Sequence, residues 1–196
     1  MNKDSLLKTI AETGYNVGFG ARKTFATFDI ASKGPGWLGL ASFAFGTFAL
    51  FTDEFAAKVP SAILLIAGVA SLYIGFYRSD EYEETAKHLL KLHYRLRDLY
   101  RSVQSGADLS SAKSDFEAIQ DEYYSVTVSK QIFLSDWYAH YKFFAQSQTE
   151  WMDEQLHFGV WKDMIPLSAK AVIVLSVAGA LGMISYKLAG VSLPFC

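Results

Sequence analysis

The sequence predicts an all-α integral membrane protein. Two uncharged stretches, residues 34–52 and 59–77, lie almost back to back, and only the short polar segment 53–58 separates them. A helix rises about 1.5 Å per residue, so each stretch is long enough to cross a hydrocarbon core about 30 Å thick. The middle section, residues 78–163, repeats leucines at helical spacing among basic residues. We therefore expect an N-terminal transmembrane hairpin joined to a helical module.

Residues 1–33 are expected to form a cytoplasmic or interfacial helix, because apolar residues recur near helical spacing between charged ones. The run Lys33-Gly34-Pro35-Gly36 contains the residues that most often interrupt helices, so we place a break there. The hairpin is then expected over residues 34–77.

Both predicted spans carry small residues on one face. In lipid, small residues let helix backbones approach closely, which favours either a tight hairpin or an interface between subunits. The plain alternative is that glycine and alanine are simply common in membrane helices. The residues that we expect to pack the helices or line a pore are Gly39, Ser42, Gly46, Ala49, Ala67, Ser71 and Gly75.

The spans hold no ionisable residue. Proton relays, voltage sensors and ion-coupled transporters usually place charges inside the membrane, so this absence argues against a coupled transporter. It leaves two possibilities, a pore lined by small and hydroxyl side chains that gates by dewetting, or a passive anchor.

Residues 78–163 are expected to form a cytoplasmic helical module. A long amphipathic helix comes first, and Asp108 or Ser110 can cap a second one. A third is expected to begin near Ser135 and to carry the aromatic residues as far as Trp151. Core packing is the more frequent fate of such aromatics. As a regulatory or assembly surface of this module we expect Leu92, Leu96, Leu99, Trp137, Tyr141 and Trp151.

A further apolar block predicts a third transmembrane helix over residues 164–188. Its uncharged part, 171–186, spans only about 24 Å as a helix. Lys170 and Lys187 can extend toward the headgroups and complete the length. The alternative is a buried or interfacial helix.

Basic residues concentrate near the two open ends of the predicted hairpin, whereas the connector holds one lysine and two acids. The positive-inside rule then places the amino terminus and the module in the cytoplasm, and a third span places the carboxyl terminus outside. The basic residues are Lys3, Lys8, Arg22, Lys23, Lys33, Arg78, Lys87, Lys91, Arg95 and Arg97.

We expect no catalytic residue, no metal site and no cofactor. Glu84 and His88 share a helix face, but no HExxH pattern surrounds them and the chain's one cysteine is Cys196. No serine has a GxSxG context. The net charge of −2 argues against direct nucleic-acid binding.

Three segments together resemble the SLATT domain family. They are GARKTFATFDIASKGPGW before the first span, EETAKHLLKLHYRLRDLYRSV after the second, and EAIQDEYYSVTVSKQIFLSDWYAHYKFF in the later module. The resemblance implies a membrane hairpin with a helical cytoplasmic module, encoded beside bacterial conflict and antiphage systems. It further implies a homo-oligomeric effector that depolarises the inner membrane and halts or kills the infected cell. A nucleotide-signalling enzyme or a reverse transcriptase encoded nearby is the implied trigger.

A second hypothesis of another class is a membrane-anchored scaffold that docks a soluble partner through its cytoplasmic helices. It requires only insertion into lipid and one exposed binding face.

Overall fold

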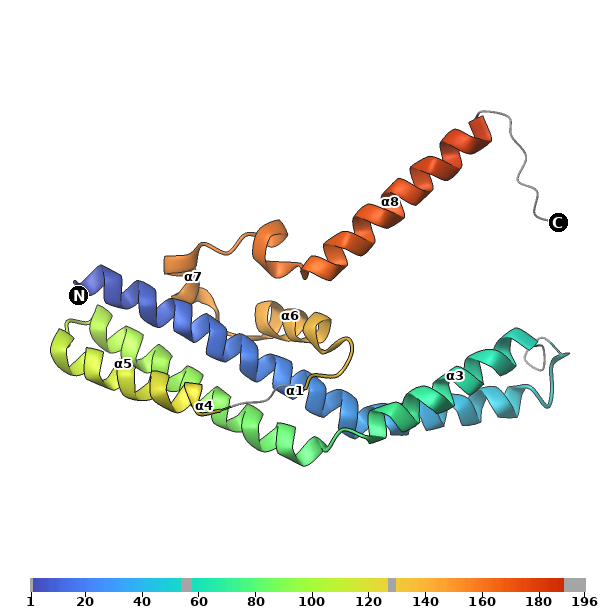
Figure 1. Cartoon of the computed structure of the whole chain (residues 1–196), viewed down its shortest axis with the longest axis horizontal. Coiled ribbons are helices and arrows are strands. Elements are labelled where there is room, and N and C mark those ends of the chain that lie inside the picture. The colour runs from blue at the N-terminus through green and yellow to red at the C-terminus, as the bar shows by residue number, and fades with distance from the viewer. Residues whose placement is uncertain (1, 54–57, 127–129, 189–196) are drawn as a thin grey trace. The chain divides into compact units, whose positions relative to one another are not determined.

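One long helix, α1 (Lys3–Phe48), organises the computed structural model (Figure 1). The structure describes residues 2–53, 58–126 and 130–188, and within these ranges every regular element is helical. This confirms the all-α expectation for the described residues. The chain divides into two units, Met1–His157 and Phe158–Cys196, and each is described by itself.

The first half of α1 is the centre of a helical bundle. Asn2 caps its start, because the Asn2 side chain accepts a hydrogen bond of 2.9 Å from the backbone N–H of Ser5. Leu6, Ile10 and Val17 are fully buried at helical spacing. Each such side chain contributes about 1.5–3 kcal/mol when it leaves water. The segment 1–33, expected as a cytoplasmic or interfacial helix, is helical from Lys3, and its buried residues belong to the core of the bundle.

The expected break at Lys33-Gly34-Pro35-Gly36 is absent, because α1 continues through Pro35 to Phe48. A proline inside a helix removes one hydrogen bond to the carbonyl four residues earlier. Contacts with other elements hold the helix here. The bundle fixes the turns before the proline, and a neighbouring helix packs alongside α1, where a β-carbon at Gly34 would lie 3.3 Å from Cδ1 of Ile74.

That neighbour is α3 (Lys58–Gly75), which returns alongside the carboxyl-terminal part of α1 (Figure 1). None of its residues is buried. We call residues 36–53, which include the last turns of α1, together with α3 the apolar arm.

The chain re-enters the bundle as α4 (Ser79–Gln104), which packs along α1, followed by α5 (Leu109–Tyr124). The turn between them is a Schellman motif. The N–H of Gly106 donates to the carbonyl of Val103 at 3.1 Å, and the N–H of Ala107 donates to the carbonyl of Ser102 at 3.1 Å. Gly106 has a φ of 98°, a conformation that glycine adopts without strain. Of the two expected caps, Asp108 and Ser110, it is Asp108 that caps α5, and its carboxylate accepts a bond of 2.8 Å from the N–H of Ser111.

The third helix expected in the module is divided into two, α6 (Ser135–Gln146) and α7 (Glu150–Leu156). The sequence between them, Ser147-Gln148-Thr149, is polar, and such side chains compete with the backbone for hydrogen bonds. Ser147 is extended, and its hydroxyl donates to the carbonyl of Lys142 at 3.2 Å. Trp151 therefore lies on α7 and not on the helix of Trp137.

The second unit contains a π-helical turn, η1 (Val160–Met164), and α8 (Leu167–Leu188). The carboxylate of Asp163 accepts a bond of 2.9 Å from the N–H of Gly159 and closes the π-helical turn. Lys170 donates to the carbonyl of Lys162 at 3.0 Å. The unit boundary after His157 falls earlier than the expected module end at residue 163.

Candidate functional site

The apolar arm exposes large hydrophobic side chains on all its outer faces. A helix that is apolar all round and unburied is typical of a segment that lies in lipid. By length and hydropathy, two of the described helical segments can cross a membrane, Lys58–Gly75 and Leu167–Ser185, and neither has a buried residue. Residues 34–52 do not meet the same condition of length and hydropathy. Helix α1 ends at Phe48, and glycine, serine and proline lower the hydropathy of its last turns.

Half-buried positions recur every three or four residues along α3 and are fewer on the arm part of α1. The seven small residues expected to pack the spans separate into two groups. Ser42, Ala49, Ala67 and Ser71 are half-buried. Gly39, Gly46 and Gly75 are exposed, and a β-carbon on any of them would meet nothing within 4 Å.

The expected regulatory surface separates in the same way. Leu92 and Leu96 are fully buried and Trp151 is 5% exposed, so these three belong to the bundle core and present no surface. Their leucine spacing marks the face of α4 that packs on α1. Leu99 is half-buried, whereas Trp137 and Tyr141 are 40% and 58% exposed on α6.

Close helix packing in the bundle depends on glycines of α1. A β-carbon at Gly14 would lie 2.3 Å from the ring of Trp151, and one at Gly18 would lie 2.6 Å from Nδ1 of His93. His93 Nδ1 donates to the carbonyl of Gly14 at 3.0 Å. Burial lowers the pKa of His93, the bond to Gly14 opposes that shift, and the charges of Arg22 and Arg97 add to it.

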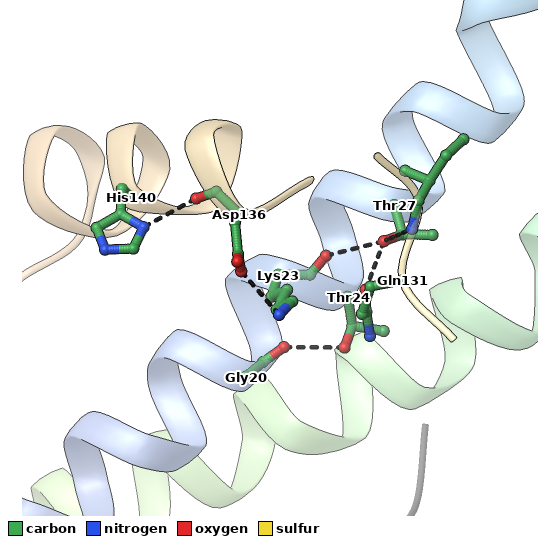
Figure 2. Close-up of polar contacts among 8 residues, drawn as sticks. Gly20, Lys23, Thr24, Thr27, Gln131, Asp136 and His140 are labelled. Atoms are coloured by element: carbon green, nitrogen blue, oxygen red, sulfur yellow. Dashed lines mark hydrogen bonds and ion pairs between the residues drawn. The ribbon is translucent and has the colours of Figure 1, made fainter. Parts of the chain in front are cut away.

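Polar contacts tie α6 and the segment before it to α1 (Figure 2). Lys23 forms an ion pair of 2.7 Å with Asp136, and the hydroxyl of Thr27 bonds to the side chain of Gln131. Two residues further along α1, Asp29 pairs with Lys142. These contacts lie on the part of α1 that precedes the apolar arm.

A basic cavity of about 350 Å³ lies between α1, α4 and the α6–α7 connection. Arg22 and Arg97 line it together with His93 and polar side chains of residues 146–148. Sequence reasoning missed this cavity, since Arg22 and Arg97 were read as charges that set membrane orientation. The helical spacing of Arg97 with His93 gave the only available signal.

No group of three or more His, Cys, Asp or Glu residues that could hold a metal ion occurs in the described part of the chain. Glu84 and His88 do not converge on a site, because His88 turns to Glu122 on α5, with His88 Nε2 3.4 Å from the nearer carboxylate oxygen.

The fold and the arm define a class, a helical membrane protein whose bundle and apolar arm share one helix. The chain belongs to the SLATT family, and the family model, described as "SMODS and SLOG-associating 2TM effector domain 6", matches residues 1–173. Membership implies an effector role in a conflict system. In the same comparisons no curated protein and no solved structure matches the chain.

Proposed function

We propose that this chain is an effector that assembles in the bacterial inner membrane and permeabilises it when a partner or a nucleotide signal triggers it. The observation that carries the proposal is the apolar arm, which has no buried residue, holds no charged residue over 36–52 and 59–75, and is continuous with the bundle through α1. Lipid and further copies of the arm are the surroundings that such a surface requires.

The matched range supports assigning the two transmembrane segments of the family to the apolar arm. Residues 1–173 contain all of the arm but only the first residues of α8. In this proposal α8 is an additional span beyond the family pattern. The amino terminus and the bundle then lie in the cytoplasm, in keeping with the positive-inside rule.

The glycines that face away from the chain support assembly into oligomers. Gly39, Gly46 and Gly75 leave open strips on the arm, where a second arm can approach closely. Association through such strips brings apolar and hydroxyl side chains around a shared axis. A pore of that kind conducts only when its apolar constriction is wetted.

The test is the membrane potential of bacteria that express the chain, first alone and then with its genomic neighbours, followed with a voltage-sensitive dye. We expect depolarisation in one of these two conditions and its loss in Gly46→Leu. Phe43→Leu is the matched control, because Phe43 is exposed on the same helix and the new side chain is identical. An unchanged potential in both conditions would refute permeabilisation.

The alternative function, a membrane-anchored scaffold, is favoured by one observation. Phe133, Trp137 and Tyr141 are exposed on or beside α6, where a partner could cover them. If the scaffold reading holds, the double variant Trp137→Ser, Tyr141→Ser releases the co-purifying neighbour protein while Phe43→Leu retains it. Retention by both variants would refute this reading.

A further inference from the structure

The cavity beside α1 has a lining rich in hydrogen-bond donors. Arg22 reaches it from α1, Arg97 from α4, and the side chains of Gln146, Ser147 and Gln148 from the α6–α7 connection. Among the described residues that line it there is no aspartate or glutamate. The cavity therefore concentrates positive charge and donors on one small volume.

The two guanidinium groups are only partly satisfied within the fold. Arg22 donates through Nε to the hydroxyl of Ser147 at 2.9 Å, and it pairs with no carboxylate in the described ranges. Arg97 donates to its chain neighbour Asp98 at 3.1–3.2 Å, contacts Gln148 at 3.4 Å and lies 4.9 Å from the ring centroid of Tyr94. One carboxylate thus balances two guanidiniums.

The third basic side chain that lines the cavity, His93, is uncharged and can accept a hydrogen bond. Since a carbonyl can only accept, the contact with Gly14 places the proton of His93 on Nδ1 and leaves Nε2 as an acceptor. The imidazole is 5% exposed, and burial lowers its pKa. A neutral His93 can accept from a hydroxyl of a bound molecule while the two guanidiniums hold its negative charge.

We infer that this cavity binds a small soluble anion that carries phosphate groups. Guanidinium groups match phosphate oxygens in geometry and form the stronger class of hydrogen bond, in which both partners are charged. The amides of Gln146 and Gln148 supply further donors, and Leu90 and Tyr94 offer apolar surface beside them. A cavity of about 350 Å³ lies within the range of small-molecule sites.

The position of the cavity along α1 favours a soluble anion over a lipid headgroup. Trp37, the first large side chain exposed on the apolar arm, follows Arg22 by about four turns, or roughly 22 Å along the axis. The headgroup region extends only about 5–8 Å beyond the hydrocarbon on each side. Arg22 therefore lies in the aqueous phase when the arm lies in lipid.

A molecule bound in the cavity would affect α6, which forms ion pairs with Lys23 and Asp29 of α1, before the arm begins. Ser147 both accepts from Arg22 and donates to the carbonyl of Lys142, and Lys142 in turn pairs with Asp29 of α1. An anion that draws Arg22 away from Ser147 alters the end of α6. The step from binding to control of the membrane rests on the proposed function, whereas the binding itself does not.

The test is calorimetric titration of the full chain, in detergent micelles, with inorganic pyrophosphate. We expect a dissociation constant of about 1 mM or tighter, weakened about tenfold or more in Arg22→Gln and in Arg97→Gln, because each loses a charge-assisted bond. Arg95→Gln is the matched control, since Arg95 lies on α4 but pairs with Glu122 of α5. Its affinity should equal that of the wild type.

Thermal unfolding without pyrophosphate checks that each variant folds. If a glutamine variant does not fold, Arg22→Lys keeps the charge and loses the planar fork, and it should still weaken binding. Absence of binding, or equal affinity in wild type, Arg22→Lys and Arg97→Gln, would overturn the inference.

A parallel titration with micelles containing phosphatidic acid separates the two sources of phosphate. Binding that needs Arg22 and Arg97 but occurs only with the lipid would refute a soluble ligand. The membrane-potential assay on Arg22→Gln and Arg97→Gln then tests control. Pyrophosphate binding without any depolarisation by the wild type would leave the site intact and refute the proposed function alone.

Discussion

Lys142 of α6 and Asp29 of α1 form an ion pair in which the two side chains are only 16% and 14% exposed. Lys33 reaches the same carboxylate from the next turn of α1 at 2.7 Å, but its side chain is 64% exposed. Burial acts to raise the pKa of Asp29. The hydrogen bonds and charges of Lys142 and Lys33 outweigh that effect and hold the pKa below its ordinary value.

Removing one lysine at a time should separate the buried pair from the exposed one. Lys142→Met should lower the free energy of unfolding by about 1.5–3 kcal/mol, the usual contribution of a hydrogen bond to a charged group. Lys33→Met should cost less than Lys142→Met, because water screens an exposed pair. Urea unfolding of the full chain in micelles measures both, and equal losses would contradict this account of the ion pair.

Acidification should destabilise the bundle through His93. Its pKa is lower in the folded chain than in the unfolded one, so the unfolded state takes up a proton first as the pH falls. Stability should be complete above about pH 6.5 and decline below it by no more than about 1.4 kcal/mol per pH unit. Urea unfolding at several pH values measures how the free energy of unfolding changes with pH. The decline below about pH 6.5 should disappear in His93→Gln and remain in His140→Gln.

Two glycines of α1 should respond in opposite directions to alanine. Gly14→Ala should destabilise by about 1–3 kcal/mol, because the new carbon overlaps the ring of Trp151. Gly20→Ala should stabilise by about 0.5–1 kcal/mol, since Leu89 Cδ1, at 4.0 Å, is the nearest atom and alanine favours a helix. Melting temperatures test the pair. Equal shifts in melting temperature would show that Gly14 and the ring of Trp151 do not pack closely.

The hairpin itself can be tested by cross-linking. With Cys196→Ser as the background, Gly34→Cys and Ile74→Cys should form a disulfide, because a β-carbon at residue 34 lies 3.3 and 3.8 Å from the branches of Ile74. Gly36→Cys with Ile74→Cys should not, since nothing lies within 4 Å of a β-carbon there. Gel mobility under non-reducing conditions distinguishes the cross-linked from the free chain. Cross-linking of the Gly36→Cys pair alone would show that Gly34 does not face Ile74.

Reporter fusions should give the topology that the charges predict. Alkaline phosphatase fused after residue 188 should be active, and green fluorescent protein there should be dark, if α8 carries the chain across the membrane. The same reporters after residue 104 should show the opposite pattern. A fluorescent fusion after residue 188 would leave α8 on the cytoplasmic side.

Local signals in the sequence predicted several elements well. The leucine spacing of α4 and the cap at Asp108 depend on neighbouring residues alone, and the structure confirms both. The continuity of α1 through Pro35 could not be read locally. It depends on contacts with other elements, the bundle before the proline and Ile74 of α3 beside Gly34.

The same limit applies to the candidate sites. Helical spacing marks Leu92 and Leu96 as one face, but it cannot say whether that face meets solvent or α1. Likewise, Gly46 and Ser71 are equivalent as small residues, and only the pairing of α1 with α3 shows that one faces outward and the other inward. The cavity joins residues from three elements, and spacing within one helix does not reveal such a site.

The unbroken course of α1 makes its two ends turn as one body. Its 46 residues extend about 69 Å, and each residue advances the helix by about 100°. If the bundle gripped α1 one residue out of register, the strip bearing Gly39 and Gly46 would swing by more than a quarter turn. Which side of the arm faces outward is therefore decided by close contacts at Gly14 and Gly18, deep in the bundle. A single-residue insertion between Thr27 and Ser32 would re-aim the arm without altering one of its own residues.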